Sequence, residues 1–314
     1  MSSSSMRGTS WTEDQMGDQS DRLVVVTGGN GGIGYVTARE LARRGAHTVL
    51  ACRDDGRAAR AVARLRAEVP GARVEARRLD LADLASIRAF AAAWDHDRLD
   101  VLVNNAAVVM VPLSRTADGF ESHFGVNHLG AYALTGLMLP HLVRSRDPRV
   151  VTVSSESQLV ARFDLDNLNG ERHYRPGAAY AQSKRANVYF SAQLHRWATA
   201  EGLPLRSMIA IPGMTDTGVL TKASQHGRLW MATVPRIVSL FAKETLEGAR
   251  PSLYAATVPD LPGGSYIAPS GPLQVRGAPA PRYGRKTVHD PATAVALWVM
   301  SARLTGVRFT NPLG

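Results

Sequence analysis

The sequence predicts an α/β protein whose single parallel sheet is doubly wound, with helices on both faces. Short apolar runs such as Leu23–Val26 alternate with helical patterns along most of the chain, which is typical of right-handed βαβ crossovers. A glycine cluster follows that first run directly, as in Rossmann-type folds. The 314 residues contain no internal repeat and no linker rich in proline and glycine, so we expect one domain.

Each expected strand is a short run that is apolar throughout or alternates in polarity. The expected strands are Leu23–Val26, His47–Cys52, Arg73–Leu79, Leu99–Asn104, Val150–Ser154 and Leu205–Ala210. Helices are expected between them, where apolar residues recur three and four positions apart. The expected helices are about Ile33–Gly45, Gly56–Val69, Ser86–Trp94, Phe120–Arg144 and Tyr180–Ala200.

Two parts of the chain fall outside this pattern. Residues 1–20 are polar and rich in serine, and we expect them to be a disordered tail before a domain at 21–314. Residues 214–285 are irregular and rich in proline and glycine. This composition indicates a C-terminal cap, with a substrate lid at about 214–245.

Composition limits the partners that we expect. The formal net charge is +10, but the arginines are scattered and only four lysines occur, so no nucleic-acid partner is expected. Cys52 is the only cysteine, which excludes a disulfide within the chain, and we expect no metal site. The first 20 residues lack the apolar core of a signal peptide, and no stretch is apolar enough to span a membrane. A cytoplasmic location is therefore expected.

A glycine-rich turn, TGGNGGIG at Thr27–Gly34, joins the first strand to the first helix. Glycine permits tight backbone dihedrals and lets the main chain approach a pyrophosphate. The helix start then offers free N–H groups and the positive end of its dipole to the phosphates. We therefore expect a dinucleotide site whose residues include Gly28, Asn30, Gly32, Ile33 and Gly34.

The end of the second strand bears on the choice between NAD and NADP. An acid there usually holds the ribose 2′-hydroxyl of NAD, whereas the 2′-phosphate of NADP needs a cation. Arg53 is the first polar residue after this strand, and its guanidinium can hold a phosphate with two hydrogen bonds. Asp54 and Asp55 follow; they lie near the spacing of an NAD acid, or they cap the next helix. We favour NADP(H).

Two further strand ends complete the expected cofactor site. Asp80 and Leu81 follow the third strand, and we expect Asp80 to meet the adenine ring. Asn105 and Ala106 follow the fourth strand, where small and amide side chains suit a wall beside the ribose.

The expected catalytic residues are Tyr180 and Lys184, which lie one helical turn apart on the same face. A free tyrosine has a pKa near ~10, and a nearby ammonium lowers that pKa by stabilising the phenolate. The phenol can then give a proton to a carbonyl oxygen while a hydride reaches the carbon. A hydroxyl of Ser154 or Ser155, which end the fifth strand, can hydrogen-bond the same oxygen.

With these motifs in this order, the chain resembles the short-chain dehydrogenase/reductase superfamily, and its retinol dehydrogenase and protochlorophyllide reductase-like branch in particular. The matching positions are Thr27-Gly28-x-x-x-Gly32-x-Gly34, Asn104-Asn105-Ala106, Asn127, Ser155, Tyr180-x-x-x-Lys184 and Pro212-Gly213. The resemblance covers about residues 21–310.

The resemblance implies roles for several residues. Tyr180 would be the acid or base, Lys184 would also hold the nicotinamide ribose, and Ser155 would orient the substrate oxygen. Asn127 would position a water in a proton relay to Lys184. Pro212, Gly213 and Thr215 would line the nicotinamide end of the cofactor site. One departure is Tyr35, where the retinol branch often has lysine, which leaves more of the NADP argument on Arg53.

These features predict an NADPH-dependent reductase of a ketone or aldehyde. Apolar residues between 214 and 245, among them Trp230 and Phe241, indicate a bulky hydrophobic substrate or simply a packed helix face. The alternatives are an alcohol dehydrogenase that uses NAD(P) in the oxidative direction and a non-catalytic regulator that senses the dinucleotide. A long segment at about Val160–Ala178 could cover the helix that other members use for dimerisation, so a monomer is favoured over a homodimer.

Overall fold

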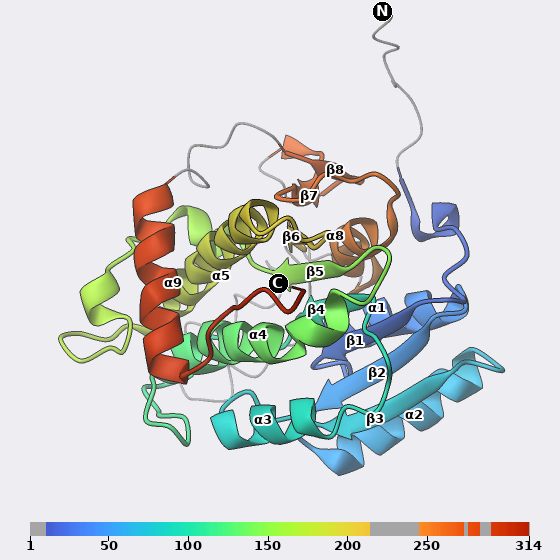
Figure 1. The fold of residues 1–314 in the computed structure, drawn as a ribbon, viewed down its shortest axis with the longest axis horizontal. Helices are drawn as coiled ribbons and strands as arrows, with labels where there is room; N and C mark the ends of the chain where they lie inside the picture. The colour runs from blue at the N-terminus through green and yellow to red at the C-terminus, as the bar shows by residue number, and fades with distance from the viewer. Residues whose placement is uncertain (1–10, 214–244, 273–275, 283–289, 314) are drawn as a thin grey trace, which may run out of the picture.

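A single sheet organises the computed structural model, which describes residues 11–213, 245–272, 276–282 and 290–313 (Figure 1). Within these residues the sheet has eight strands in the order β3-β2-β1-β4-β5-β6-β7-β8. The strands are β1 (Leu23–Thr27), β2 (His47–Cys52), β3 (Val74–Arg78), β4 (Val101–Asn104), β5 (Arg149–Val153), β6 (Arg206–Ala210), β7 (Tyr266–Pro269) and β8 (Pro279–Pro281). Neighbouring strands are parallel except for β7 and β8. The six predicted strands are confirmed to within two residues at each end.

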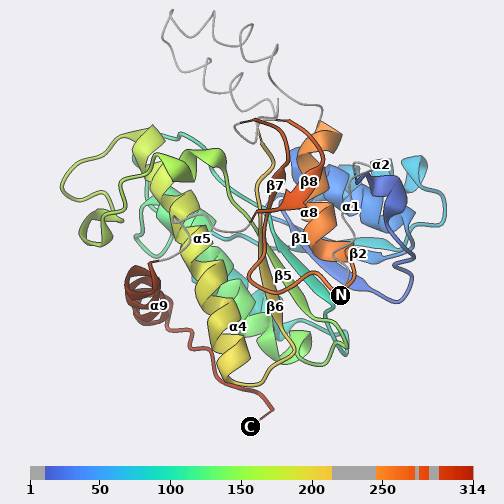
Figure 2. The same ribbon diagram turned by 90° about the horizontal axis from the view of Figure 1, so that it is seen from above.

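Helices cover both faces of the sheet (Figure 2). One face carries α1 (Gly32–Arg43), α2 (Asp55–Glu68) and α8 (Thr245–Thr257), and the other carries α3 (Leu84–Ala92), α4 (Ala131–Leu142) and α5 (Pro176–Ala200). The last helix, α9 (Pro291–Thr305), lies against α5. The predicted doubly wound Rossmann-type fold is therefore confirmed.

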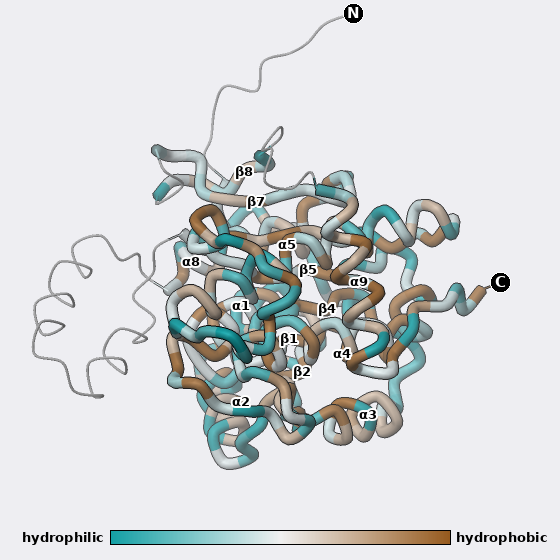
Figure 3. The backbone as a smooth tube through the Cα atoms, turned by 90° about the vertical axis from the view of Figure 1, so that its left-hand side faces the viewer, coloured by the Kyte–Doolittle hydropathy of each residue, from teal (hydrophilic) through white to brown (hydrophobic). Residues whose placement is uncertain are grey.

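The alternation of side chains along each strand explains why helices are needed on both faces. Val24 and Val26 belong to the core beneath α1 and α8, whereas Val25 belongs to the core beneath α4 and α5, and none of the three is exposed. Hydrophobic segments accordingly run through the middle of the molecule in the strands (Figure 3). Full burial of each valine contributes roughly 1.5–3 kcal/mol to stability. No helix in the described part of the chain is both long and apolar enough to cross a bilayer.

The N-terminal segment differs from the expected disordered tail over residues 11–20. The short helix η1 (Glu13–Gln15) packs against α8, where the Arg250 Nε donates to the Glu13 Oε2 at 2.8 Å. The ring of Trp11 lies edge-on against Tyr254, with 5.2 Å between the ring centroids. Only a few side chains in this polar segment contact the rest of the domain, so its composition did not predict an ordered structure. Residues 1–10 lie outside the described part.

The expected irregular cap is also wrong over residues 245–272 and 276–282. In this part, α8 packs against α1 and both β7 and β8 extend the sheet. The helix contains Pro251, and β8 is an edge strand that begins and ends with proline, so both resemble loop sequence. The predicted lid at 214–245 lies outside the described residues, except for its last position.

Two helices have different boundaries from those predicted. The helix expected over 120–144 is divided into η2 (His123–Gly130), which has π-helical geometry, and α4. A π-helical segment of 8 residues is too short for its longer repeat to be told from that of an α-helix, so sequence patterns do not reveal it. The helix that carries Tyr180 begins earlier, at Pro176, so Tyr180 lies in its second turn rather than at its start.

Candidate active site

A cleft of about 1050 Å³ opens at the carboxyl ends of the central strands. This is the edge at which open α/β sheets bind ligands. The cleft brings together most of the site residues that the sequence predicts. They are Gly28, Asn30, Gly32, Ile33, Gly34, Asn105, Ala106, Ser155, Tyr180, Lys184, Pro212 and Gly213.

The glycine-rich turn is packed so closely that two of its glycines cannot be replaced without displacement. A Cβ on Gly34 would lie 2.4 Å from the Asn105 Nδ2 and 2.6 Å from the Gly28 carbonyl oxygen. Gly28 itself has a φ of +67°, which side chains disfavour. Asn105 secures the turn from the other side, because its Nδ2 donates to the Thr27 carbonyl at 2.9 Å. The end of β4 therefore holds the turn that follows β1.

The start of α1 fits a dinucleotide phosphate. Its N-cap is Gly31, which supplies no side-chain hydrogen bond, whereas the caps of α2 and α3 are Asp54 and Asp83. A Cβ at Gly31 or Gly32 would meet nothing within 4 Å, so the space in front of the helix is open. The N–H groups of the first turn are thus left to an anion that enters the cleft.

Arginines line the cleft at positions that sequence reasoning missed. The predicted Arg53 is exposed and is not among the lining residues, whereas Arg57, Arg60 and Arg64 of α2 are. The guanidinium of Arg64 lies 4.4 Å from the centroid of the Tyr35 ring, a cation–π contact between α2 and α1. The spacing of three, four and seven positions on one helix was the signal that could have found them.

Three other predicted cofactor residues are not placed in the cleft. Asp80 lies at the carboxyl end of β3, where its Oδ1 accepts from the Ala82 N–H at 2.9 Å, and Leu81 is buried. Neither lines the cleft, so the contact of Asp80 with adenine and the place of Leu81 in the cofactor site stay predictions. Thr215 lies outside the described residues.

The two serines after β5 have different surroundings. Ser154 is 2% exposed, and its hydroxyl donates to the Lys184 carbonyl oxygen at 2.7 Å, which ties β5 to α5. Ser155 is half-buried at the start of η3 (Glu156–Leu159), where its Oγ accepts from the Ser157 N–H at 3.3 Å, and it lines the cleft together with Tyr180. Of the pair, Ser155 is therefore the one that can reach a bound substrate oxygen.

The phenol of Tyr180 and the ammonium of Lys184 share the same wall of the cleft. The Lys184 Nζ lies 5.8 Å from the centroid of the Tyr180 ring and donates to the Val153 carbonyl at 3.1 Å. Burial raises the pKa of Tyr180, and the hydrogen bond with Ser155 offsets part of that rise. Burial lowers the pKa of Lys184 to about 8. That Lys184 lowers the pKa of Tyr180 stays a prediction.

Asn127 is 1% exposed in η2, and its amide is occupied by protein partners. Its Oδ1 accepts from the Val108 N–H at 2.8 Å, and its Nδ2 donates to the Val108 carbonyl at 3.0 Å and to the Ser183 Oγ at 2.9 Å. The amide thus holds the segment that follows β4 against α5. The water relay to Lys184 stays a prediction. Val109 and Met110, which the sequence did not single out, line the cleft on this segment.

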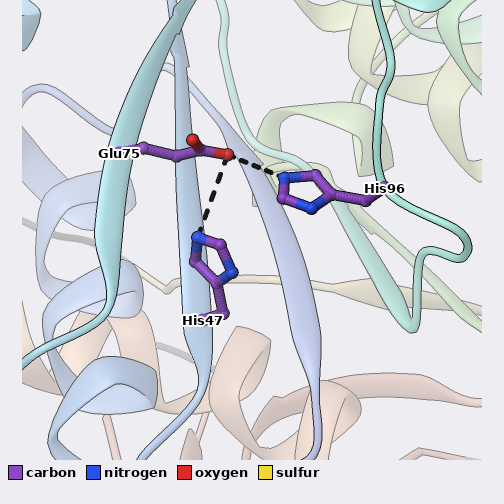
Figure 4. A group of neighbouring side chains, drawn as sticks. All are labelled: His47, Glu75 and His96. Atoms are coloured by element: carbon purple, nitrogen blue, oxygen red, sulfur yellow. Dashed lines mark hydrogen bonds and ion pairs between the residues drawn. The ribbon is translucent and has the colours of Figure 1, made fainter.

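A second cluster of ionisable groups lies at the opposite, amino-terminal edge of the sheet (Figure 4). The Nε2 atoms of His96 and His47 lie 2.9 Å and 3.8 Å from the Glu75 Oε1. A guanidinium already occupies the centre of this cluster, because the Arg77 Nε donates to the same oxygen at 3.2 Å. A metal ion would have to displace that cation, so we describe the cluster as an ion-pair network. The expectation of no metal site stays a prediction.

Comparisons with known proteins agree with this geometry. The family model for the short chain dehydrogenases matches residues 22–227. Mouse retinol dehydrogenase 12 is 38% identical over 292 residues, which cover 92% of this chain and 87% of the relative. Human polyprenol dehydrogenase is 42% identical over 256 residues, which cover 79% and 76% of the two chains.

A solved structure of an uncharacterized protein from Mycobacterium paratuberculosis superposes with a TM-score of 0.79. It is 41% identical, and the match covers 96% of this chain and 100% of the other. The resemblance noted on the sequence motifs is thereby confirmed. The chain belongs to the short-chain dehydrogenase/reductase superfamily, in the branch of the retinol dehydrogenases, and is an oxidoreductase of that family.

Proposed function

We propose that the protein reduces a ketone or aldehyde to the alcohol with NADPH, and that the substrate is bulky and hydrophobic. The observation that carries this proposal is the meeting of Ser155, Tyr180 and Lys184 at one end of a cleft whose other end is the glycine-rich turn. Two relatives are named for alcohols, retinol and polyprenol, which supports exchange between an alcohol and a carbonyl compound.

The side chains divide the chemistry between them. A bound nicotinamide supplies the hydride that reaches the carbonyl carbon. The Tyr180 Oη donates its proton to the carbonyl oxygen as the C–H bond forms, and the Ser155 hydroxyl hydrogen-bonds that oxygen while charge develops on it. The raised pKa of Tyr180 keeps the phenol protonated at neutral pH, which is the form that reduction requires.

The preference for NADPH rests on charge along α2. Arg57, Arg60 and Arg64 line the cleft, and a 2′-phosphate needs a cation. Asp54 has a different task, because its Oδ1 caps α2. The capping role of Asp54, one of the two acids that could have indicated NAD, supports this preference. Cytoplasmic location and a monomeric state remain part of the proposal on the sequence argument alone.

The test measures the activity of the purified full-length protein with NADPH or NADH on a panel of aldehydes and ketones. Oxidation of the cofactor is monitored by nicotinamide fluorescence. We expect NADPH to be oxidised only with a carbonyl substrate. Tyr180→Phe should lower kcat by ~10²–10⁴, the contribution of general acid catalysis, without weakening NADPH binding. Tyr189→Phe, on the same helix and buried outside the cleft, is the matched control.

Two results would overturn the proposal. One is full activity of Tyr180→Phe. The other is turnover of alcohols with NAD alone, which would favour the oxidative direction.

A further inference from the structure

We propose that Met110, together with Val109, selects the substrate of the proposed reductase by holding an apolar side chain over the catalytic end of the cleft. The inference rests on the proposed function and adds to it the residue that favours a bulky apolar carbonyl compound. It is carried by the way in which the backbone on either side of Met110 is fixed.

The first fixed point is Val108, two residues before Met110. Both of its main-chain polar groups are held by one buried amide, since the Val108 N–H donates to the Asn127 Oδ1 and the Val108 carbonyl accepts from the Asn127 Nδ2. The distances are 2.8 Å and 3.0 Å. Because the Asn127 side chain both donates to and accepts from the main chain of Val108, it holds the backbone at Val108 in one position.

The second fixed point is Val111, directly after Met110. Its N–H donates to the His123 Nε2 at 3.3 Å, and its carbonyl accepts from the Tyr174 hydroxyl at 2.8 Å. His123 is not exposed at all. Because Val111 offers a hydrogen to the Nε2, the proton of a neutral His123 lies on the Nδ1.

A buried carboxylate holds that tautomer in place. The Glu121 Oε1 lies 2.7 Å from the His123 Nδ1 and accepts from the His123 main-chain N–H at 3.0 Å. The Tyr174 Oη, whose hydrogen goes to Val111, lies 3.2 Å from the same carboxylate oxygen. Glu121 is 1% exposed. The ring of His123 also packs edge-on against Tyr180, with centroids 6.1 Å apart. The clamp on Val111 therefore shares a contact with the catalytic phenol.

Between the two fixed points, Met110 adopts a backbone conformation that L residues avoid. Its φ is +51°, in the left-handed region. Such a conformation persists where the surroundings impose it, and it is frequent at ligand-binding sites. Glycine would adopt it without strain, so the methionine side chain is present at some cost to the backbone.

The side chain that this arrangement presents is apolar, exposed and inside the cleft. Met110 is 48% exposed, and both Met110 and Val109 line the same cleft as Ser155 and Tyr180. A flexible thioether adapts to a large, irregular apolar surface, and burial of its exposed area against a ligand favours binding. A small polar carbonyl compound would leave that area in water and gain nothing from it.

The test compares Met110→Ala with Leu113→Ala. Leu113 is the matched control, because it is a 47% exposed apolar residue on the same segment and does not line the cleft. Each variant is assayed with NADPH on a long-chain or polycyclic aldehyde and on a small polar aldehyde. We expect Met110→Ala to lower kcat/KM for the bulky aldehyde about 10-fold, within the range for lost hydrophobic pocket contacts, and to change the small one less than twofold. Leu113→Ala should change neither.

Tyr174→Phe tests the clamp without altering the wall of the cleft. The loss of one hydroxyl should raise KM for the bulky aldehyde several-fold, raise KM for the small aldehyde less than twofold and leave NADPH binding unchanged, a pattern that general destabilisation would not produce. If Met110→Ala leaves the ratio of kcat/KM between the two aldehydes unchanged, this inference is overturned and the proposed function is not. A wild-type protein that turns over neither aldehyde would overturn the proposed function together with it.

Discussion

The Oδ1 of Asp54 accepts a hydrogen bond from the main-chain N–H of Arg57 at 2.8 Å. One contact thus begins α2 and sets the first arginine of its cleft-lining face in place. It also gives Asp54, the first of the two acidic residues after β2, a role as a helix cap.

The capping role leads to a prediction that concerns stability and leaves cofactor choice unchanged. Asp54→Ala should lower the free energy of unfolding by about 1 kcal/mol, the usual value of an N-cap, whereas Asp54→Asn should retain most of it. Urea denaturation measures this, and steady-state kinetics should give the same ratio of kcat/KM for NADPH and NADH in all three proteins. A selective loss of NADH activity in Asp54→Asn would contradict the capping role.

Arg57 should matter for the cofactor that carries an additional phosphate. We expect Arg57→Ala to raise KM for NADPH about 10-fold and KM for NADH by less than twofold, because a charge-assisted hydrogen bond contributes about 1.5–3 kcal/mol. Arg53→Ala tests the residue that the sequence favoured in the same assay. Arg172→Ala, an exposed arginine outside the cleft, is the control. Equal effects of Arg57→Ala on the two cofactors would contradict the prediction.

The buried ammonium of Lys184 should lower the free energy of unfolding. Burial lowers its pKa from 10.5 to about 8, so at pH 7 the ammonium destabilises the protein by about 3 kcal/mol. Lys184→Met removes this cost and the hydrogen bond to Val153, worth about 1 kcal/mol, so the cofactor-free variant should be about 2 kcal/mol more stable while turnover collapses.

The sign of the pH dependence follows from the direction of that shift. Between the folded pKa near 8 and the ordinary value of 10.5, the unfolded chain binds more protons, so wild-type stability rises with pH. The difference in free energy of unfolding between the wild type and Lys184→Met, measured by chemical denaturation, should therefore become smaller from pH 8 upward. A Lys184→Met protein that is less stable at pH 7 would contradict the account.

His128 should contribute to acid unfolding. It is buried within an aromatic cluster, stacked on Phe124, and burial lowers its pKa from 6.5 to about 3. The unfolded chain binds more protons across that interval, so stability falls as the pH drops from 6.5 toward 3. His128→Phe should flatten this slope and cost about 1 kcal/mol at pH 7 for the lost bond to Ser301.

Asp147 should be critical because it compensates a buried cation. Arg149 is 1% exposed, and its Nη2 donates to the Asp147 Oδ2 at 2.8 Å. Burial alone would raise the pKa of Asp147, but the hydrogen bonds of Arg149 and Arg206 outweigh it and hold that pKa well below its usual range. Asp147→Asn should destabilise the protein by about 3–5 kcal/mol near neutral pH.

The contribution of Asp147 is present above its ordinary pKa of 3.8 and is lost as the pH falls below it. The difference in stability between the wild type and Asp147→Asn should accordingly become smaller in acid, as thermal unfolding at several pH values would show. A constant gap would mean that the charge is not its cause.

Much of the fold could be read from the sequence because its strands are buried on both faces. A continuous apolar run such as that of β1 is typical of a central strand in a parallel sheet, and the turn TGGNGGIG follows that run immediately. The parts that the sequence did not reveal are fixed by tertiary contacts. Glu13 helps to order the N-terminal segment because Arg250 lies opposite it, and the two residues are 237 positions apart.

The site shows the same division. Ser155, Tyr180 and Lys184 could be predicted because their spacing places them on one strand end and one helix face. Met110 could not, since its importance depends on a backbone angle and on hydrogen bonds from distant residues. Arg53 was predicted because it directly follows the strand end, which is visible in a sequence. Arg57 was missed because the side of α2 that faces the cleft is set by how the helix packs.

Cys52, the only cysteine of the chain, lies 3% exposed at the end of β2, and burial raises its pKa to about 11. A thiol in that state reacts with disulfide reagents only when β2 opens, because the thiolate is the nucleophile and the native packing shields it. The wild-type protein therefore carries a label-free reporter of its own opening. The Gly28 N–H donates to the carbonyl of Ala51, the neighbour of Cys52, at 2.8 Å, so the rate of thiol modification should also register any ligand that closes over the glycine-rich turn.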